Sequence, residues 1–393
     1  MKAIGITTLL LFLVFVLSAP AGGEWISRLG ELEIRIVDQY VELLLEGDAK
    51  ERLESAFSYA RYFLPFVQEQ IALRGLPAEL AYLPIIESGY NPDAISPSGA
   101  VGIWQFMENT MGEYGLDLTA GVDERRDFWK STDAALRKLE SDYQRFGDWS
   151  LALAAYNCGT NCVKRAIDRS GISNYWDLVR TEELPPGTRG YVPKLLAILK
   201  IVERADELGY SGWAPHRIEW KQIRTESAVH LGMMLERLDI DDLVIRLGNA
   251  ELVAMAAPRG HILKLPSEYA DTITKGLRNP EVQMSDYLVH RIRQGDTLSS
   301  LAARYGVKID SITSFNPGIK ARFLQLNSSV IIPESYMHRT SGVHVVQPGD
   351  TLWGIARAYS VSVDDLVSVN SISDPDTIHP GLTLNLPYSV NDH

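Results

Sequence analysis

The sequence predicts an α+β protein of several domains, in which a mainly α-helical domain precedes small β-α-α-β modules. Two observations carry this prediction. Apolar residues recur at helical spacing from residue 31 to about residue 208, a pattern typical of amphipathic helices. A segment of about 45 residues then occurs twice in the C-terminal third, and such repeats indicate a modular architecture. A chain of 393 residues is long enough for two or more domains.

The first residues are typical of a secretory signal. A lysine is followed by an almost unbroken apolar run from Ala3 to Leu17, and small residues come next. The run is shorter than the roughly 20 apolar residues that a membrane span needs. The sequence therefore predicts a signal peptide over residues 1–21, cleaved after Ala21, and an exported protein of the periplasm or cell envelope. The alternative is an uncleaved N-terminal anchor, which would associate the protein with a membrane.

Composition argues against several classes of function. The formal charge of -12 and the pI near 5.2 argue against nucleic acid as a partner, because such proteins carry a basic surface. No cluster of cysteine and histidine has the spacing of a metal site, so the sequence predicts neither a metal nor a cofactor. The two cysteines, Cys158 and Cys162, lie four residues apart. They are equally compatible with a local disulfide and with two reduced thiols.

Helices are expected throughout the first half of the chain. Pro84 should kink its helix or keep it short, and Ser131-Thr132-Asp133 is typical of a helix start. The apolar periodicity predicts helices over residues 31–45, 80–86, 131–139, 149–156 and 191–208.

The repeat in the C-terminal third has a constant offset of 54 residues. Each copy predicts a short strand, an Asp-Thr helix cap, two helices and a closing strand. The first copy holds Gly295, Asp296 and Thr297, followed by Leu298. The matched pairs are Gly295 and Gly349, Asp296 and Asp350, Thr297 and Thr351, Leu298 and Leu352, Val289 and Val343, Tyr305 and Tyr359, Val307 and Val361, Asp310 and Asp364, Asn316 and Asn370, and Pro333 and Pro387.

These copies closely resemble LysM modules, a family that binds glycans containing N-acetylglucosamine. The resemblance implies modules over residues 286–334 and 343–388, with glycan binding at Gly295-Asp296-Thr297 and Gly349-Asp350-Thr351. The first copy departs from the second where Asn327 replaces Gly381, so its closing turn is expected to differ.

A weaker third copy covers residues 215–270. It ends in a strand-like Ile262 to Pro266 but lacks the Gly-Asp-Thr start. We interpret it as a degenerate LysM-like module or a spacer. Linkers are expected near residues 211–217, 276–286 and 334–342.

The densest chemical signal runs from Glu87 to Met107. Glu87 ends an apolar helix, and a carboxyl group against apolar walls has a raised pKa, so it can hold a proton near neutral pH. A glycosidic bond needs such a proton on its leaving oxygen. The stretch that follows is rich in Gly, Ser and Pro, as expected of a loop that shapes a cleft. Trp104 and Gln105 then offer a stacking face and an amide, which suit an acetamido sugar.

This segment resembles the catalytic domain of goose-lysozyme-like lytic transglycosylases, with its Glu-Ser start and Gly-x-x-Gln segment. The resemblance continues through Gly147-Asp148-Trp149 and Ala155–Gly159 to Tyr191–Lys194. It implies a helical lysozyme-like domain over residues 22–210, with its core at about 60–205. Together with the LysM modules, the arrangement is similar to the D-type family of lytic murein transglycosylases. Two departures are the missing lipid-attachment cysteine and Gly187, where a glutamate is expected.

The resemblance also implies the roles of individual residues. Glu87 is the catalytic acid and then the base. For Ser96 the alternative is a loop-internal hydrogen bond, and for Trp104 a place in the core. For Tyr156 and Asn157 it is a buried polar pair between two helices. The residues implied to position the sugar are Ser96, Trp104, Gln105, Tyr156, Asn157 and Tyr191.

The implied mechanism needs one carboxyl group. Retaining and inverting glycosidases normally use two. The candidates for a second are Asp93, Asp123, Glu124 and Asp127, but residues 123–127 look like charged surface or local pairing. Glu87 would protonate the oxygen between N-acetylmuramic acid and N-acetylglucosamine, and the sugar's own 6-hydroxyl would close a 1,6-anhydro end. The predicted partner is therefore the glycan strand of peptidoglycan. The alternatives are a hydrolytic muramidase of the same fold and a non-catalytic peptidoglycan-binding protein.

Overall fold

The computed structural model describes most of residues 30–387, and the predicted signal peptide lies outside the described residues. No described helix is both long and apolar enough to cross a membrane. The chain divides into two compact units, each described by itself: residues up to Gln105 with Thr132–Arg217, and Phe106–Ser131 with Ile218 onward. The undescribed positions from residue 30 are 120, 211–214, 241–242, 253–254, 279–282, 285–286, 306, 317–318, 320–323, 327, 334–339, 348, 360, 362, 364–365, 368–369, 371, 373–377 and 388–393.

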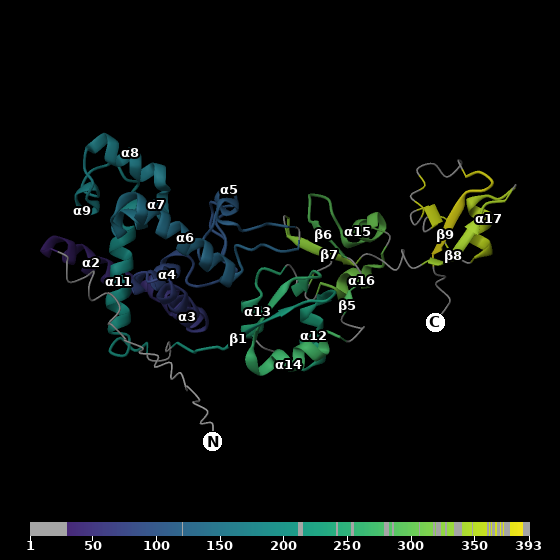
Figure 1. Ribbon diagram of the computed structural model, residues 1–393, viewed down its shortest axis with the longest axis horizontal. Coiled ribbons are helices and arrows are strands. Elements are labelled where there is room, and N and C mark those ends of the chain that lie inside the picture. Colours follow the sequence, from purple (N-terminus) through teal and green to yellow (C-terminus); the bar gives the residue numbers. More distant parts are fainter. Residues whose placement is uncertain are drawn as a thin grey trace, which may run out of the picture. The chain divides into compact units, whose positions relative to one another are not determined.

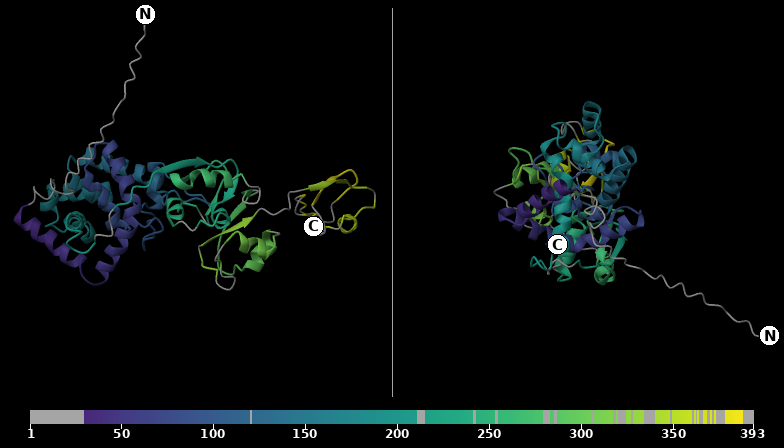
Figure 2. Two further views of the ribbon diagram at one scale, coloured as in Figure 1. Left: turned by 90° about the horizontal axis from the view of Figure 1, so that it is seen from below. Right: turned by 90° about the vertical axis from the view of Figure 1, so that its left-hand side faces the viewer.

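The first unit consists of helices and the loops between them, drawn in purple to teal in Figures 1 and 2. Helix α6 begins in the short segment that belongs to the second unit and continues into the first. The helices are α2 (Glu31–Leu44), α3 (Gly47–Leu73), the 3-10 helix η1 (Ala78–Tyr82), α4 (Leu83–Glu87), α6 (Phe128–Phe146), α7 (Trp149–Cys158), α8 (Thr160–Ser170), α9 (Tyr175–Leu178), α10 (Pro186–Arg189) and α11 (Tyr191–Glu203).

Helix α11 forms the centre of the first unit's core. Nine of its 13 residues are buried, and it packs against α2, α4 and α7. A helix that is apolar on most of its surface is stable only when other elements surround it. The apolar periodicity to residue 208 overestimates its length, because the helix ends at Glu203 and turns follow.

Most of the predicted helices are confirmed, and the predicted start of α6 is wrong. Pro84 lies in the first turn of α4, which is only five residues long, as expected of a proline in that segment. Helix α6 begins at Phe128 rather than near Ser131. The Asp127 carboxylate accepts hydrogen bonds from the backbone N–H groups of Trp129 (2.9 Å) and Lys130 (3.1 Å). The N-cap of this helix is therefore Asp127, four residues before Ser131, where the sequence pattern predicted the helix start.

A disulfide joins Cys158 at the end of α7 to Cys162 in α8, with the two Cα atoms 5.8 Å apart. The sequence was equally compatible with a disulfide and with two reduced thiols, and the structure has the disulfide.

The second unit contains the segment 106–131 and a series of small antiparallel sheets. The segment 106–131 carries α5 (Glu108–Met111) and the 3-10 helix η2 (Gly112–Tyr114). We call residues 218–284 the middle region. It has two sheets: in one, β1 pairs with β4, and in the other, β2 lies between β3 and β5. Its elements are β1 (Trp220–Arg224), β2 (Ala228–His230), α12 (Leu231–Arg237), α13 (Leu243–Gly248), β3 (Ala256–Ala257), β4 (Ile262–Pro266), α14 (Ser267–Gly276) and β5 (Gln283–Met284).

The two predicted repeats form the expected strand pairs. We call them module 1 (residues 287–333) and module 2 (residues 340–387). Module 1 has both expected helices. In module 2 the first helix is confirmed, and much of the second predicted helix lies outside the described residues. In each module, the first strand pairs antiparallel with the last, and a small apolar core lies between the sheet and the helices. The elements are β6 (Tyr287–Arg291), α15 (Leu298–Tyr305), α16 (Ile309–Ser314) and β7 (Ser329–Pro333) in module 1, and β8 (Thr340–Val345), α17 (Leu352–Ala358) and β9 (Thr383–Pro387) in module 2.

Candidate active site

Glu87 is the last residue of α4, and the turn after it is fixed from three sides. The Ser88 hydroxyl donates to the carbonyl oxygen of Ile103 at 2.9 Å. Gly89 has a φ of +64°, and a Cβ there would lie 3.2 Å from the Cβ of Ala56, so a larger residue would be both strained and crowded. Tyr90 is fully buried, and its hydroxyl donates to the carbonyl oxygen of Ala81 at 2.6 Å. The position of the Glu87 carboxyl is thereby tied to α3, to η1 and to the loop before Trp104.

The Glu87 carboxyl group accepts a hydrogen bond from the hydroxyl of Tyr191. Burial raises the pKa of Glu87 to about 7, against the opposing effects of the Tyr191 hydrogen bond and the charge of Lys194. Burial and the neighbouring Glu87 raise the pKa of Tyr191 well above its usual value, so the phenol keeps its proton. A carboxyl group that is half protonated near neutral pH can both give and take a proton.

Tyr191 is placed by the start of α11 and by the short helix before it. Gly190 precedes Tyr191, and a Cβ there would lie 2.1 Å from the hydroxyl oxygen of Tyr40, so only glycine fits without a shift. The hydroxyl of Tyr175 lies 3.0 Å from the carbonyl oxygen of Thr188 and 2.9 Å from that of Arg189. These contacts hold the turn that aims Tyr191 at Glu87.

Ser96 and Gln105 make hydrogen bonds inside the loop that follows Glu87. The Ser96 hydroxyl accepts from the backbone N–H of Ala100 (2.9 Å) and pairs with the Ser98 hydroxyl (2.9 Å). The amide of Gln105 donates to the carbonyl oxygen of Gly102 at 2.9 Å, and Gln105 itself has a φ of +53°. The loop-internal hydrogen bond, which was the alternative for Ser96, is present. A sugar would have to compete with these bonds or use the remaining oxygen lone pairs.

Trp104 belongs to the core, so the expectation that it offers a stacking face to a sugar is wrong. Its side chain is fully buried. Its indole N–H donates to the Thr132 hydroxyl at 2.9 Å, which satisfies the one polar group of a buried tryptophan. The Tyr156 hydroxyl donates to the backbone carbonyl of Trp104 at 2.9 Å, and the two rings meet edge to face. Trp104 therefore anchors the loop between Glu87 and α6.

Asn157 is exposed and links two helices. Its side-chain oxygen accepts from the Thr188 hydroxyl at 2.8 Å, which connects α7 to α10. The alternative for Asn157 was a buried polar residue that holds two helices together. Asn157 does connect two helices, but it is exposed. Gly187 lies in the same short helix, and a Cβ there would meet nothing within 4 Å. A glutamate at that position would have room.

The structure joins Glu87 to Tyr191 and Trp104 to Tyr156, two pairs far apart in the sequence. For Ser96, Gln105 and Asn157 it records bonds to the protein itself. Sequence reasoning assigned no role to Ser88 or Lys194, although both stand in the quoted motifs. A serine and a glycine directly after the apolar helix are a turn signal, and this signal could have indicated that Ser88 helps to fix the turn after Glu87.

The acidic residues of the segment 123–127 are paired. Asp123 bridges Arg125 at 2.8 Å, and Glu124 bridges Lys130. Local pairing is therefore confirmed, but Arg125 and Asp127 are buried, so the description as charged surface is wrong for them. In the described residues, no carboxylate contributes to the pKa of Glu87.

The Gly-Asp-Thr segments form the same hydrogen-bonded loop in both modules. In module 1, the Asp296 carboxylate lies 2.7 Å from His290 Nε2 and accepts from the Arg293 N–H, also at 2.7 Å. The His290 hydrogen bond holds the pKa of Asp296 below its usual range. Thr297 accepts from the Ser300 N–H at 3.0 Å, so the threonine alone caps the helix. Gly295 has a φ of +90°. The corresponding bonds of Asp350 and Thr351 repeat this pattern.

Comparison with known proteins finds two kinds of domain in this chain. The model of the transglycosylase SLT domain matches residues 66–179, and the LysM domain model matches residues 290–333 and 344–387. Membrane-bound lytic murein transglycosylase D of Escherichia coli K12 is 30% identical over 403 residues, covering 94% of this chain and 86% of that protein. This chain belongs to the lytic murein transglycosylase D family.

Other similarities cover only parts of the chain. A putative tributyltin chloride resistance protein of an Alteromonas strain is 39% identical over 29% of this chain and 55% of its own length. The 70 kDa soluble lytic transglycosylase of Escherichia coli is 23% identical over 45% of this chain and 30% of its own, with a TM-score of 0.30. A TM-score that low supports no conclusion about this chain.

The contact between Tyr191 and Glu87 leads to a prediction about the pH dependence of cleavage. Tyr191→Phe removes a hydrogen bond that favours the ionised carboxylate, so the pKa of Glu87 should rise above about 7. If protonated Glu87 starts the reaction, the alkaline limb of the pH–rate profile should move to higher pH. The rate of wall-fragment release should be measured from pH 5 to pH 9.

Tyr156→Phe is the matched control, because it also removes one phenolic hydroxyl but bonds to Trp104 instead of Glu87. Its alkaline midpoint should match that of the parent. A downward shift in Tyr191→Phe, or equal shifts in both variants, would contradict the role of this contact.

Proposed function

We propose that this member of the family is a lytic transglycosylase of the cell envelope. It cleaves the β-1,4 bond between N-acetylmuramic acid and N-acetylglucosamine and leaves a 1,6-anhydro end. The observation that carries the proposal is the partly buried carboxyl group of Glu87, with a pKa of about 7 and a phenol hydrogen-bonded to it. The family relation supports murein as the substrate, because the relative's name states it.

The proposed reaction returns Glu87 to its starting state. Protonated Glu87 gives its proton to the bridging oxygen, and the bond between that oxygen and the anomeric carbon of N-acetylmuramic acid breaks. The acetamido oxygen of the same sugar stabilises the positive anomeric carbon. Ionised Glu87 then takes the proton of the 6-hydroxyl, whose oxygen bonds to the anomeric carbon. No water is consumed, and the intramolecular attack has the advantage of proximity.

A mechanism with one carboxyl group is proposed because, among the described residues, no carboxylate contributes to the raised pKa of Glu87, whereas glycosidases normally use a pair. Tyr191 donates to the carboxylate formed after the first step and so stabilises it. Lys194 provides a positive charge near the same group. Both effects favour proton donation by Glu87, while burial keeps the proton available at neutral pH.

Mass spectrometry of the products released from purified walls tests the proposal. Fragments should end in anhydro sugars, lighter by one water than hydrolysed ends. Glu87→Gln should release fragments about 10²- to 10⁴-fold more slowly, the usual range for loss of a general acid. Hydrolysed ends would identify a muramidase instead. Unchanged release by Glu87→Gln would remove Glu87 from the reaction.

The stability of Glu87→Gln provides the folding control. Because the folded-state pKa is raised from 4.5 to about 7, the folded state binds the proton more tightly, and stability falls as pH rises through that window. The glutamine does not ionise. Relative to the parent, the variant should therefore gain stability between pH 4 and pH 8, by at most about 3 kcal/mol. A variant that is inactive and also less stable at pH 8 would point to misfolding.

We further propose that modules 1 and 2 hold the enzyme on the glycan while the active site works nearby. Two weak sites on one chain raise the effective concentration at a polymer. Deleting residues 286–393 should therefore weaken sacculus binding at least tenfold while cleavage of short soluble fragments changes little. Sedimentation with sacculi and release from soluble fragments measure the two effects. Equal losses in both assays would contradict this division of labour.

A further inference from the structure

The middle region repeats the fold of module 1 residue by residue. Strand β1 pairs with β4 with Trp220 opposite Pro266, as β6 pairs with β7 with Tyr287 opposite Pro333. Trp220 and Tyr287 are 67 residues apart, and so are the two prolines. Helix α12 begins at Leu231 and α15 at Leu298, again 67 residues later. Because the offset is constant from the first strand to the last, the two copies align without an insertion or a deletion.

One asparagine makes the same three hydrogen bonds in the middle region as in the two modules, and it is buried in the middle region and in module 1. In the middle region, the Asn249 amide donates to the carbonyl oxygens of Ile245 and Lys264, and its oxygen accepts from the Lys264 N–H. The partners lie four residues before and 15 residues after the asparagine. Asn316 bonds Ile312 and Ile331, and Asn370 bonds Leu366 and Asn385, at the same two separations.

The Gly-Asp-Thr loop has been replaced in the middle region. Ala228-Val229-His230 stand in its place and form β2, which pairs with β3 on one side and β5 on the other. His230 takes over the capping role of the threonine, because its Nδ1 accepts from the Met233 N–H at 3.1 Å. Side chains also cross between the two loops beside this strand. The Thr225 hydroxyl donates to the Pro258 carbonyl (2.7 Å) and Arg224 to the Gly260 carbonyl (2.8 Å).

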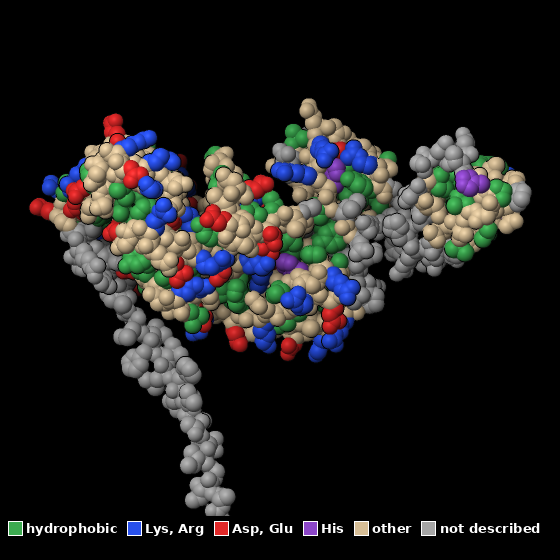
Figure 3. Space-filling view, turned by 45° about the horizontal axis from the view of Figure 1, so that its top comes forward, with side chains coloured by type: hydrophobic (Ala, Val, Ile, Leu, Met, Phe, Trp, Pro, Cys, Tyr) green, Lys and Arg blue, Asp and Glu red, His purple; other side chains and the backbone are tan. Residues whose placement is uncertain are grey.

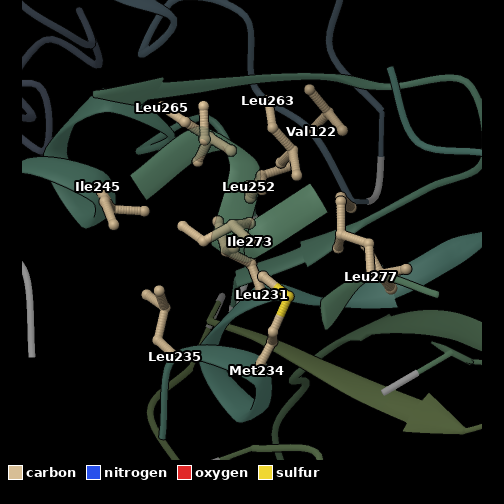
Figure 4. Packing of buried hydrophobic residues seen from close by; sticks show 13 residues of the cluster. Val122, Leu231, Met234, Leu235, Ile245, Leu252, Leu263, Leu265, Ile273 and Leu277 are labelled. Atoms are coloured by element: carbon tan, nitrogen blue, oxygen red, sulfur yellow. The ribbon is translucent and has the colours of Figure 1, made fainter. Parts of the chain in front are cut away.

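The segment 106–131 packs into the core of this middle region. Val122 lies opposite Leu252 in an antiparallel bridge, and the Asp123 N–H donates to the Glu251 carbonyl oxygen at 2.9 Å. Only 8% of Val122 is exposed, and Figure 4 shows it beside Leu263 in the apolar cluster.

Buried charges complete the contact. The Lys264 ammonium donates to the carboxylates of Asp127 and Glu251, and all three side chains are at most 3% exposed. His261 Nε2 lies 2.9 Å from the same oxygen of Glu251. Burial opposes the charge of Lys264, but the two carboxylates outweigh it and raise its pKa. Removing one member of such a buried group leaves an unpaired charge.

We infer that residues 218–277 are a third LysM fold whose partner is the segment 106–131 of the same chain instead of a glycan. Lys264 is the positioning residue for that segment. The segment lies inside the region that matches the transglycosylase family, so the catalytic sequence depends on a downstream module for part of its own structure. The series of small modules thus begins with an adaptor, and the two glycan-binding copies follow.

Limited proteolysis of the full-length protein tests this inference. Lys264→Met leaves Asp127 and Glu251 without their cation, so the segment should detach and trypsin should cut at Arg125 and Arg126 at least tenfold faster. Binding of N-acetylglucosamine oligomers should remain unchanged. Val122→Ser attacks the same contact from the segment side and should expose the same sites, which covers the case in which Lys264→Met does not fold.

Lys308→Met removes an exposed lysine of module 1 and should leave the cleavage rate at Arg125 and Arg126 unchanged. Parental protection of the segment in both Lys264→Met and Val122→Ser would overturn the inference. Loss of oligomer binding in folded Lys264→Met would also overturn it, because the third copy would then be a glycan site.

A second inference rests on a different observation, the opposite charge of modules 1 and 2. Module 1 has six Lys and Arg residues against two Asp, whereas module 2 has one Arg against five Asp. Figure 3 shows Lys and Arg side chains gathered around a histidine on module 1, while the visible face of module 2 is largely uncharged. Tandem copies of one fold that differ this much in charge are suited to different ligands.

The charge difference includes residues that line a groove in module 1. A cavity of about 460 Å³ in module 1 is lined by Arg291, Ile292, Arg293, Gln294 and Leu326. The residues of module 2 that correspond to the two arginines are Val345 and Gln347. Among the described residues, no ion pair is recorded for Arg291 or Arg293, so both guanidinium groups are available to an anionic ligand.

Module 2 instead exposes apolar groups. Val345 is 45% exposed and Trp353 63%. Arg357, the one basic residue in this module, lies over the Trp353 ring at 5.3 Å. An aromatic face of this kind suits the apolar face of an uncharged sugar.

Building on the proposed glycan binding, we propose that module 1 prefers carboxylate-bearing peptidoglycan, with Arg291 and Arg293 contacting carboxylates of the lactyl group or peptide stem. Module 2 prefers uncharged glycan without stems. Guanidinium groups bind carboxylates in a planar, two-pronged geometry, and exposed pairs of this kind weaken as salt screens them.

Calorimetry on the full-length protein tests the preference with two probes, a soluble muropeptide with its stem and a chito-oligosaccharide of equal length. Arg293→Gln introduces the module 2 residue. It should lower muropeptide affinity about two- to fivefold at low salt, as expected for one exposed ion pair. Chito-oligosaccharide affinity should stay the same. The difference should disappear at 0.5 M salt.

Lys308→Gln is the control, since it removes the same charge outside the groove. Equal loss with both probes, or the same loss in Lys308→Gln, would overturn the preference while leaving glycan binding intact. Failure of the parent to bind either probe would overturn the proposed glycan binding itself.

Discussion

The catalytic unit depends on one interaction, the partly buried hydrogen bond between the Glu87 carboxyl group and the Tyr191 hydroxyl. Burial alone would make Glu87 a poor proton donor, because its pKa would rise further, and exposure would leave it ionised at neutral pH. The phenol and Lys194 offset part of that effect and leave the pKa near 7. The close approach at Gly190 and the turn at Gly89 are needed because this balance requires both side chains to be fixed.

The small modules depend on a different constraint, the satisfaction of buried backbone groups in a chain of fewer than 50 residues. One asparagine donates to the carbonyl oxygen four residues before it. It also bonds to the carbonyl oxygen and the N–H of one residue in the closing strand. This bond set occurs in all three copies. The surface loops are then free to vary. In two copies the start loop is Gly-Asp-Thr, and in the third it has become a strand that is paired on both sides.

The third copy shows how a binding fold can become a scaffold. Its closing strand carries Lys264 where module 1 has Ile331 and module 2 has Asn385. That lysine is compatible with a buried position because two carboxylates pair with it, Glu251 from the same module and Asp127 from another segment. The substitution therefore binds the middle module to the segment 106–131. It also links the stability of part of the catalytic sequence to residues that the transglycosylase match does not include.

The sequence by itself predicted several helices of the first unit, the repeat, and Glu87 as the candidate acid, because these depend on local periodicity, register and motif. Tertiary structure alone decided that Trp104 is core and that Asp127 pairs with Lys264, 137 residues away. A tryptophan suits a core and a sugar site equally well, and an acidic residue in a charged run does not reveal its partner. Which side chains meet across such distances is set by packing, and packing is a property of the whole fold.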